Sequence, residues 1–240
     1  DKNPIDKVKK KDKGAFYTPK EIVHFMCQES IEAYLLAKDD LRFDNEALGK
    51  STIHKIIHQI DLEEEEKVFA EKNAYKIIDA LENVRICDPA IGSGAFPMGI
   101  LQEIFNAQIY LQELKGFKKI NEADIKKHII QESIYGVDIE PGAVDIARLR
   151  FWLSLVVDEE LPQPLPNLDF KIVCANSVVE LGTITYNDVS GNYKIVEQMA
   201  DVRHKYFNAS KQLKEDLEKE FNTLQNSLFK NAKEWVTKAD

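Results

Sequence analysis

The segment VRICDPAIGSGAFPMGI, residues 84–100, places a short apolar strand directly before a glycine-containing turn and an apolar helix. Gly92 and Gly94 permit positive φ angles and let a ligand approach the backbone closely, because no Cβ stands in the way. A strand, a tight turn and a helix in this order are typical of βαβ units, which build parallel sheets. This segment therefore predicts an α/β fold with a ligand site at the strand ends.

Strand-like and helix-like patterns alternate after residue 84. The segments VRICDP, IYGVDI and LDFKIVCAN predict strands at residues 84–89, 134–139 and 168–176. Helices are predicted between and after them, with Gly116, Asn121 and Pro141 as boundary signals, at residues 95–116, 121–133 and 141–160. The order indicates an α/β protein with a Rossmann-like fold, a partial doubly wound parallel sheet.

A helix is predicted before this region, over residues 19–37. Thr18 suits the N-cap, Pro19 the first helical position, and Glu21 would close a capping box. Its expected apolar face consists of Ile22, Phe25, Met26, Leu35 and Leu36.

The remaining segments are polar. Residues 39–72 predict exposed helices or loops, and residues from 193 onward predict two long surface helices with a break at Asn208 and Ser210. We therefore divide the chain into an N-terminal helical segment (1–83), a Rossmann-like half-domain (84–180) and a helical arm (181–240).

Composition restricts the environment of the protein. No apolar run among the 240 residues approaches the roughly 20 that a membrane span needs, and the N-terminus is charged, so a cytoplasmic protein is expected. Three widely spaced cysteines, Cys27, Cys87 and Cys174, predict buried, reduced thiols. The net charge of −9 disfavours broad contact with nucleic acid, and the basic run at residues 7–13 predicts a solvated tail.

Three polar residues lie at the ends of the predicted strands. Asp88 could pair with an ammonium group, Asp138 could accept the hydrogens of a ribose diol, and Asn176 could contact an adenine edge. Pro97 stands where a dinucleotide fingerprint has its third glycine, and no Lys-Ser/Thr pair follows as in a phosphate loop. A nucleoside with an amino-acid tail fits this set, and S-adenosylmethionine is such a molecule.

His54 and His58 have the i, i+4 spacing of a helical metal motif, in HKIIH. Lys55 occupies the position at which a zinc protease carries glutamate. The pair predicts a solvated helical face, and no metal ligand is assigned.

The ordered segments GAFYTP, DPAIGSGAF, VDIEPGAVDIARLRFWLSL and LDFKIVCANS resemble the N-terminal half of adenine-N6 DNA methyltransferases. The resemblance is greatest to the large type IIG restriction-modification polypeptides and covers residues 14–180. It implies a class I methyltransferase fold, S-adenosyl-L-methionine as the cofactor and double-stranded DNA as the partner.

The resemblance also implies roles for single residues. The loop before the first helix would close over the methionine end of the cofactor, the glycine turn would bind the methionine moiety, and the next two strand ends would hold ribose and adenine. The residues are, in that order, Phe16, Tyr17, Thr18 and Pro19; Asp88, Ala90, Gly92 and Gly94; Asp138 and Ile139 with Asn176.

One motif of these enzymes is missing from the 240 residues. No Asn/Asp-Pro-Pro-Tyr/Phe tetrapeptide, which would hold the flipped target base, occurs in the sequence. We therefore assign no catalytic residue and expect the chain to be an inactive part of a longer enzyme. A methyltransferase acting on RNA or protein and a non-catalytic interaction module remain alternatives.

Overall fold

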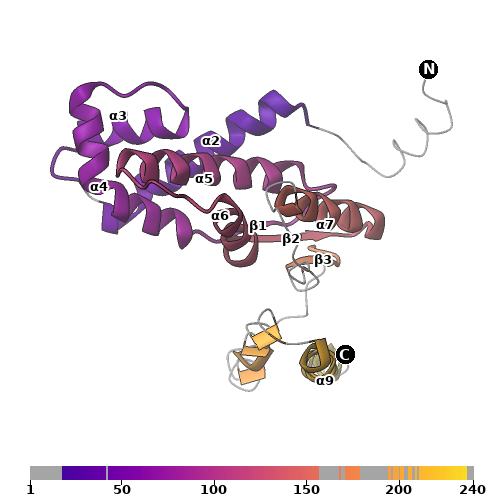
Figure 1. Cartoon of the computed structure of the whole chain (residues 1–240). Coiled ribbons are helices and arrows are strands. Elements are labelled where there is room, and N and C mark those ends of the chain that lie inside the picture. Colours follow the sequence, from indigo (N-terminus) through magenta and orange to yellow (C-terminus); the bar gives the residue numbers. More distant parts are fainter. Residues whose placement is uncertain are drawn as a thin grey trace. The chain divides into compact units, whose positions relative to one another are not determined.

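The structure is a computed structural model, and it describes residues 18–41, 43–156, 168, 171–178, 194–195, 197–199, 201–202, 205–206, 209 and 211–236. The chain forms two compact units. The first contains residues 1–164 and 171–177, and the second contains residues 165–170 and 178–240. The glycine turn, the first two predicted strands and residues 171–176 of the third belong to the first unit (Figure 1).

The first unit contains a small parallel sheet. Its strands are β1 (Ile86–Asp88), β2 (Ile134–Asp138) and β3 (Ile172–Cys174), in the order β1-β2-β3. Asp88 is paired in register with Gly136, and Asp138 with Cys174. Both strand pairs are parallel, so all three strands end at one edge of the sheet. The predicted α/β class and parallel pairing are confirmed for these three strands.

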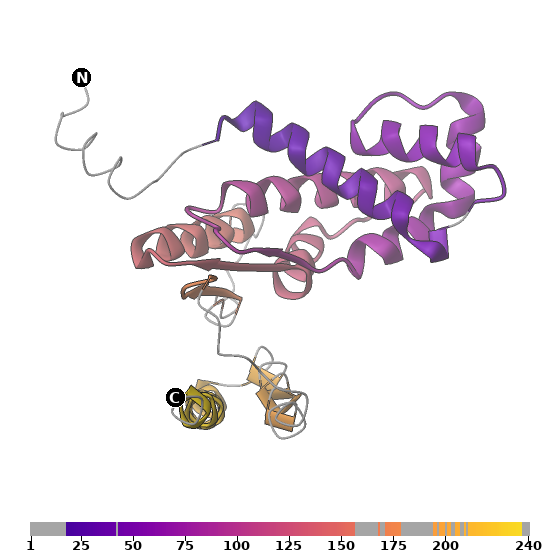
Figure 2. The same ribbon diagram turned by 180° about the vertical axis from the view of Figure 1, so that it is seen from behind.

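Two helices that follow strands pack against the sheet. α5 (Ala95–Leu114) follows β1, and α7 (Pro141–Val156) follows β2. Both contact β2, and α7 also contacts β3. Figures 1 and 2 show them on the same side of the strands from the front and from behind. This face of the sheet is therefore covered by the helices of consecutive βα units.

Three predicted helix boundaries are confirmed by the structure. α5 ends at Leu114, two residues before Gly116, and α7 begins at Pro141. The Asn121 side chain accepts a hydrogen bond of 3.3 Å from the Asp124 backbone N–H, which caps α6 (Glu122–His128). The predicted helix then continues as one π-helical turn, η2 (Ile129–Ser133), which leads into β2.

α2 (Lys20–Ala37) forms where a helix was predicted, but two details differ. Pro19 is the N-cap residue and no side chain caps the helix, so the predicted Thr18–Glu21 capping box is wrong. The buried face is formed by Val23, Cys27, Gln28, Ile31 and Leu35. Among the five residues predicted for this face only Leu35 is buried, because the helix is rotated to pack on α5 and α3.

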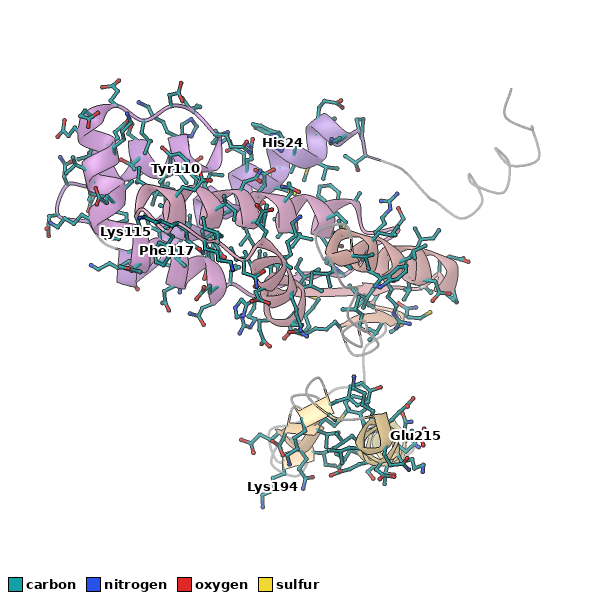
Figure 3. The ribbon with its side chains drawn as sticks, viewed as in Figure 1. His24, Tyr110, Lys115, Phe117, Lys194 and Glu215 are labelled. Carbon is teal, nitrogen blue, oxygen red and sulfur yellow. The ribbon has the colours of Figure 1, made fainter. Side chains whose placement is uncertain are left out.

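Three titratable side chains, Cys27, His24 and Glu103, lie where α2 packs against α5. The Cys27 thiol donates to the Phe96 carbonyl at 3.5 Å. Burial and, to a lesser extent, the nearby Glu103 carboxylate raise the pKa of the Cys27 thiol to about 12. His24, labelled on α2 in Figure 3, places Nδ1 2.6 Å from Oε1 of the buried Glu103.

Residues 39–72 are more deeply packed than predicted. They form η1 (Asp39–Leu41), α3 (Glu46–Ile57) and the start of α4 (Glu64–Glu82). Both helices pack on α2 and α5, and their inner faces are buried. The prediction of exposed elements is wrong for these faces, because the many charged residues concealed apolar positions such as Ile53 and Ile57, at helical spacing.

The acidic run before α4 forms a helix start. Glu63 and Glu66 form a reciprocal capping box, in which the Glu66 carboxylate accepts from the Glu63 N–H at 2.9 Å. Lys55 and Ser51 also donate to that carboxylate, each at 2.6 Å. The hydrogen bond from Lys55, which has the largest effect, and the one from Ser51 lower the pKa of Glu66 to about 2. This network joins α3 to α4.

The second unit contains α9 (Lys211–Val236). Leu217 of this helix packs with Val202 and Tyr206 in a small buried cluster. The described residues between 194 and 206 are helical, as predicted, whereas Asn208 and Ser210 lie outside the described residues. No helix in the described part of the chain is long and apolar enough to cross a membrane.

The three cysteines are free, but only Cys27 is buried, so the prediction of buried thiols is wrong for Cys87 and Cys174.

We expect a thiol-alkylating reagent at neutral pH to label Cys87 and Cys174 rapidly and Cys27 only slowly, because the pKa of Cys27 is raised and its side chain is inaccessible. Peptide mass mapping over time measures this order. Denatured protein, in which all three should react together, is the control, and equally fast labelling of Cys27 in the folded chain would contradict the α2–α5 packing.

Candidate functional site

The carboxyl ends of the strands bring together most of the predicted ligand residues. Asp88 ends β1, Asp138 ends β2, and Asn176 lies two residues beyond β3. We call the set formed by Asp88, residues 89–94, Asp138, Ile139 and Asn176 the strand-end rim. Parallel pairing places these positions at one edge of the sheet, where open α/β sheets bind their ligands.

Asp138 connects the glycine turn to β2. Its Oδ2 accepts a hydrogen bond of 2.7 Å from the Gly92 backbone N–H, and its Oδ1 accepts one of 2.9 Å from the Glu140 N–H. The Ile91 N–H donates to the Val137 carbonyl at 2.9 Å. The turn after β1 is therefore attached to the end of β2 by a side-chain and a backbone hydrogen bond.

Gly136 is a residue of this site that the sequence analysis did not identify. A Cβ at Gly136 would lie 2.2 Å from Cδ1 of Ile91, so only glycine lets the turn pack directly on β2. Ile91 itself is buried. The available signal was a glycine in the middle of a predicted strand, which often marks close approach of another part of the chain.

Asp88 lies half-buried beside the turn. One of its oxygens accepts a hydrogen bond of 3.0 Å from the Ala90 N–H. Burial raises the pKa of Asp88 despite this bond, and the negative charge of Asp138 raises it as well. Two carboxylates therefore influence each other at the rim, which favours a ligand group that is cationic or donates hydrogen bonds.

The turn leaves open the space that a small ligand group would need. Gly92 has φ +52°, and a Cβ built there would meet no atom within 4 Å. Gly94, with φ +85°, is the N-cap of α5, where no side chain caps the helix and no acidic residue occupies the first turn. Backbone N–H groups at such a helix start attract anions.

The segment after β3 completes the rim. The Ala175 N–H donates to the Asp138 carbonyl at 2.9 Å, which places Asn176 directly beyond this bond. The Ser177 hydroxyl donates to the Pro89 carbonyl, so this segment also contacts the glycine turn. Ile139 is 69% exposed at the same edge. The structure thus brings together seven of the predicted residues: Asp88, Ala90, Gly92, Gly94, Asp138, Ile139 and Asn176.

The predicted closing loop is described only in part. Thr18 and Pro19 precede α2, and the Pro19 carbonyl accepts hydrogen bonds from the N–H groups of Ile22 and Val23. No hydrogen bond between described residues joins Thr18 or Pro19 to the rim. Phe16 and Tyr17 lie outside the described residues. α2 is related to the rim through its packing on α5, which begins directly after the turn.

His54 of α3 and His58, the C-cap residue of this helix, form part of a second polar cluster. His54 is 47% exposed, but His58 is only 15% exposed, so the prediction of a solvated face is wrong for His58. Both rings contact Glu32 of α2. Glu32 was not predicted as a member of this cluster, because nothing in the local sequence pattern places it beside α3.

The sequence is similar to those of known restriction-modification methylases. Residues 132–239 match the family described as Eco57I restriction-modification methylase. A protein of Methanocaldococcus jannaschii named "Putative type II restriction enzyme and methyltransferase" is 33% identical over 179 residues, an alignment that covers 69% of this chain. No solved structure matches the chain.

The chain spans 14% of the length of this relative. The family match contains β2, β3 and two of the three strand-end polar positions, Asp138 and Asn176. The identity to the relative extends the likeness over more than two thirds of the chain. Residues 132–239 therefore belong to the Eco57I family of restriction-modification methylases.

Proposed function

We propose that the chain binds S-adenosyl-L-methionine at the strand-end rim and forms the cofactor-binding part of a site-specific DNA adenine-N6 methyltransferase. One observation carries this proposal: the Asp138 carboxylate holds the N–H of Gly92 at 2.7 Å, with Asp88 close enough for their charges to interact. A glycine turn thus lies between two carboxylates, an arrangement suited to a cationic nucleoside.

The methionine end of the cofactor fits the turn by charge. Its ammonium group would pair with Asp88, whose charge is partly desolvated and only partly satisfied by the Ala90 N–H. Its carboxylate would lie at the start of α5, which lacks a capping side chain. The open space at Gly92 would allow this close backbone approach.

The nucleoside end fits the second and third strand ends. Each oxygen of Asp138 already accepts one N–H, and each retains a lone pair that could accept a ribose hydroxyl. Ile139 offers an exposed apolar surface next to it for a planar base. Asn176 would then contact the adenine edge.

The bound cofactor supplies an electrophilic methyl group on sulfonium. In this proposal the residues of the chain bind and orient it, and no side chain here acts as a nucleophile or base. The family description supports DNA as the substrate class. Adenine as the target base, double-stranded DNA as the partner, a complete Rossmann-like sheet, a cytoplasmic location and the division at residues 83 and 180 remain parts of the proposal.

Calorimetric titration of the 240-residue chain with S-adenosylhomocysteine tests this function. Binding of one molecule per chain, with no comparable heat from NAD or ATP, is the expected result. Folded protein that binds none of the three would contradict the cofactor assignment and favour an interaction module.

Asp138→Ala should weaken binding of S-adenosylhomocysteine by about 10 to 150-fold, or about 1.5 to 3 kcal/mol, because a charged acceptor for the ribose hydroxyls is lost. Asp138→Asn keeps one acceptor oxygen for a backbone N–H and is the matched variant, with an expected smaller loss. Dissociation constants from calorimetry measure both effects. An unchanged constant in folded Asp138→Ala protein would refute the ribose assignment.

Asp88→Asn should also weaken cofactor binding while it raises the thermal unfolding midpoint at neutral pH. The pKa of Asp88 is raised in the folded state, so its ionised form destabilises the fold, and asparagine avoids this charge while it can still accept from the Ala90 N–H. Because protonation neutralises the aspartate, the advantage of the variant should shrink as the pH falls toward the Asp88 pKa. Unfolding midpoints over a pH series measure this, and a variant less stable than the parent at neutral pH would contradict it.

A further inference from the structure

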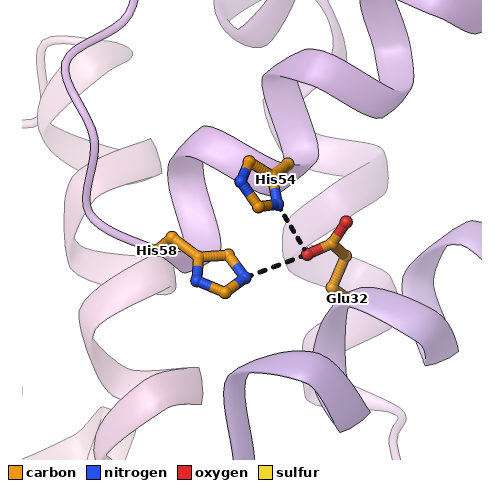
Figure 4. A group of neighbouring side chains, drawn as sticks. All are labelled: Glu32, His54 and His58. Atoms are coloured by element: carbon orange, nitrogen blue, oxygen red, sulfur yellow. Dashed lines mark hydrogen bonds and ion pairs between the residues drawn. The ribbon is translucent and has the colours of Figure 1, made fainter. Parts of the chain in front are cut away.

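A cluster of metal-ligating side chains lies on two helices outside the strand-end rim. Glu32 belongs to α2, His54 belongs to α3, and His58 is the C-cap residue of α3. The Nδ1 atom of His54 lies 2.9 Å from Oε2 of Glu32, and the Nε2 atom of His58 lies 3.0 Å from the same oxygen. Figure 4 shows both rings directed at this carboxylate.

The packing of α2 against α3 fixes this geometry. His54 and His58 are four residues apart and so lie on the same side of α3, with ring centroids 4.3 Å apart. The Gln28 side chain, one turn before Glu32, donates to the carbonyl of Ile57 at 3.1 Å. Ile53 and Ile57 are buried beside the histidines. The three ligand groups are therefore held together by the fold before any ion binds.

We propose that Glu32, His54 and His58 bind a divalent transition-metal ion of the zinc class. One donor atom from each residue lies within 4.8 Å of the other two. A tetrahedral zinc ion, with bonds of about 2.0 to 2.1 Å, places its ligand atoms about 3.3 to 3.4 Å apart. The two nitrogen–oxygen distances of 2.9 and 3.0 Å would thus lengthen by a few tenths of an ångström, and the two ring nitrogens, which lie within 4.8 Å of each other, would take up the tetrahedral separation by side-chain rotation.

The hydrogen-bond arrangement supports an ion at this position. Two rings point a nitrogen at one carboxylate oxygen, which accepts from both when Glu32 is ionised and each ring carries its proton on that nitrogen. A cation placed between them would instead receive a lone pair from each of the three atoms. Glu32 is 19% exposed and His58 is 15% exposed, so their donor atoms are partly withdrawn from water before binding.

Glu29 could provide a fourth ligand. It lies three residues before Glu32 on α2, and its Oε1 is 3.6 Å from Nε2 of His58. Its side chain is 51% exposed, so it can move toward the ion or leave this position to a water molecule. Two imidazoles and one or two carboxylates suit zinc, nickel or cobalt better than magnesium or calcium, which prefer oxygen ligands throughout.

The ion would act as a cross-link between α2 and α3 and has no part in methyl transfer. Its binding should stabilise the folded state, because the unfolded chain does not hold the three ligands together. The proposal therefore stands independently of cofactor binding at the strand-end rim.

Zinc titration of the metal-free 240-residue chain tests the site, with calorimetry and thermal unfolding as the two measurements. We expect one ion per chain and, at free zinc about 100-fold above its dissociation constant, an unfolding midpoint raised by about 5 to 10 °C. Magnesium at the same concentration should change neither measurement.

Matched variants assign the ligands. The double variant His54→Ala/His58→Ala and the single variant Glu32→Gln, which keeps a hydrogen-bond acceptor, should each weaken zinc binding by at least about 100-fold, more than is typical when an outer-shell partner is lost. His128→Ala removes an exposed histidine of α6 and should leave binding unchanged. Glu32→Gln keeps the result interpretable if the double variant does not fold.

Cobalt substitution separates this site from binding by the exposed Cys87 and Cys174. Visible bands without a thiolate charge-transfer band would support histidine and carboxylate ligands. Thiolate bands, equal zinc affinity in the parent and in folded Glu32→Gln, or no zinc-dependent stabilisation would each overturn the proposal.

Discussion

The hydrogen bond from the Gly92 N–H to the Asp138 carboxylate is the interaction on which the strand-end rim depends. It joins two residues 46 positions apart and connects the turn after β1 to the end of β2. A carboxylate that accepts a backbone N–H at 2.7 Å forms a charge-assisted bond, which is short and strongly directional. The position of the turn, and with it the start of α5, is therefore determined by the neighbouring strand.

This bond requires close packing beneath it. Gly136 lets the Ile91 side chain lie directly against β2, and the backbone bond between Ile91 and Val137 fixes the height of the turn above the sheet. Those contacts stabilise the turn, whereas ionised Asp88 destabilises it, because partial burial and the nearby Asp138 carboxylate raise the pKa of Asp88. A partly buried carboxylate with a raised pKa is the kind of group that binding sites contain, which is consistent with the function proposed for the strand-end rim.

Helices α2, α3, α4 and α5 form a layer that contacts both the strand-end rim and the cluster of Glu32, His54 and His58. The rim and the cluster share no residue. α2 packs on α5, whose first residue follows the glycine turn. α2 also packs on α3, and Glu32 of α2 contacts His58 at the end of that helix. Buried apolar residues on α2, α3, α4 and α5 hold these helices together. The same layer therefore borders both the nucleoside site proposed at the sheet edge and the metal site proposed between α2 and α3.

The sequence by itself determined the strands, the parallel order that places Asp88 and Asp138 at one edge, and the helix boundaries at Gly116, Asn121 and Pro141, because these depend on periodicity and on the backbone preferences of single residues. It did not determine which face of α2 is buried, that Glu66 both caps α4 and pairs with Lys55, or that Glu32 meets His54 and His58. Those features depend on how separate helices rotate and pack to cover apolar surface. Only the tertiary structure decides them, since no local pattern records the partner across an interface.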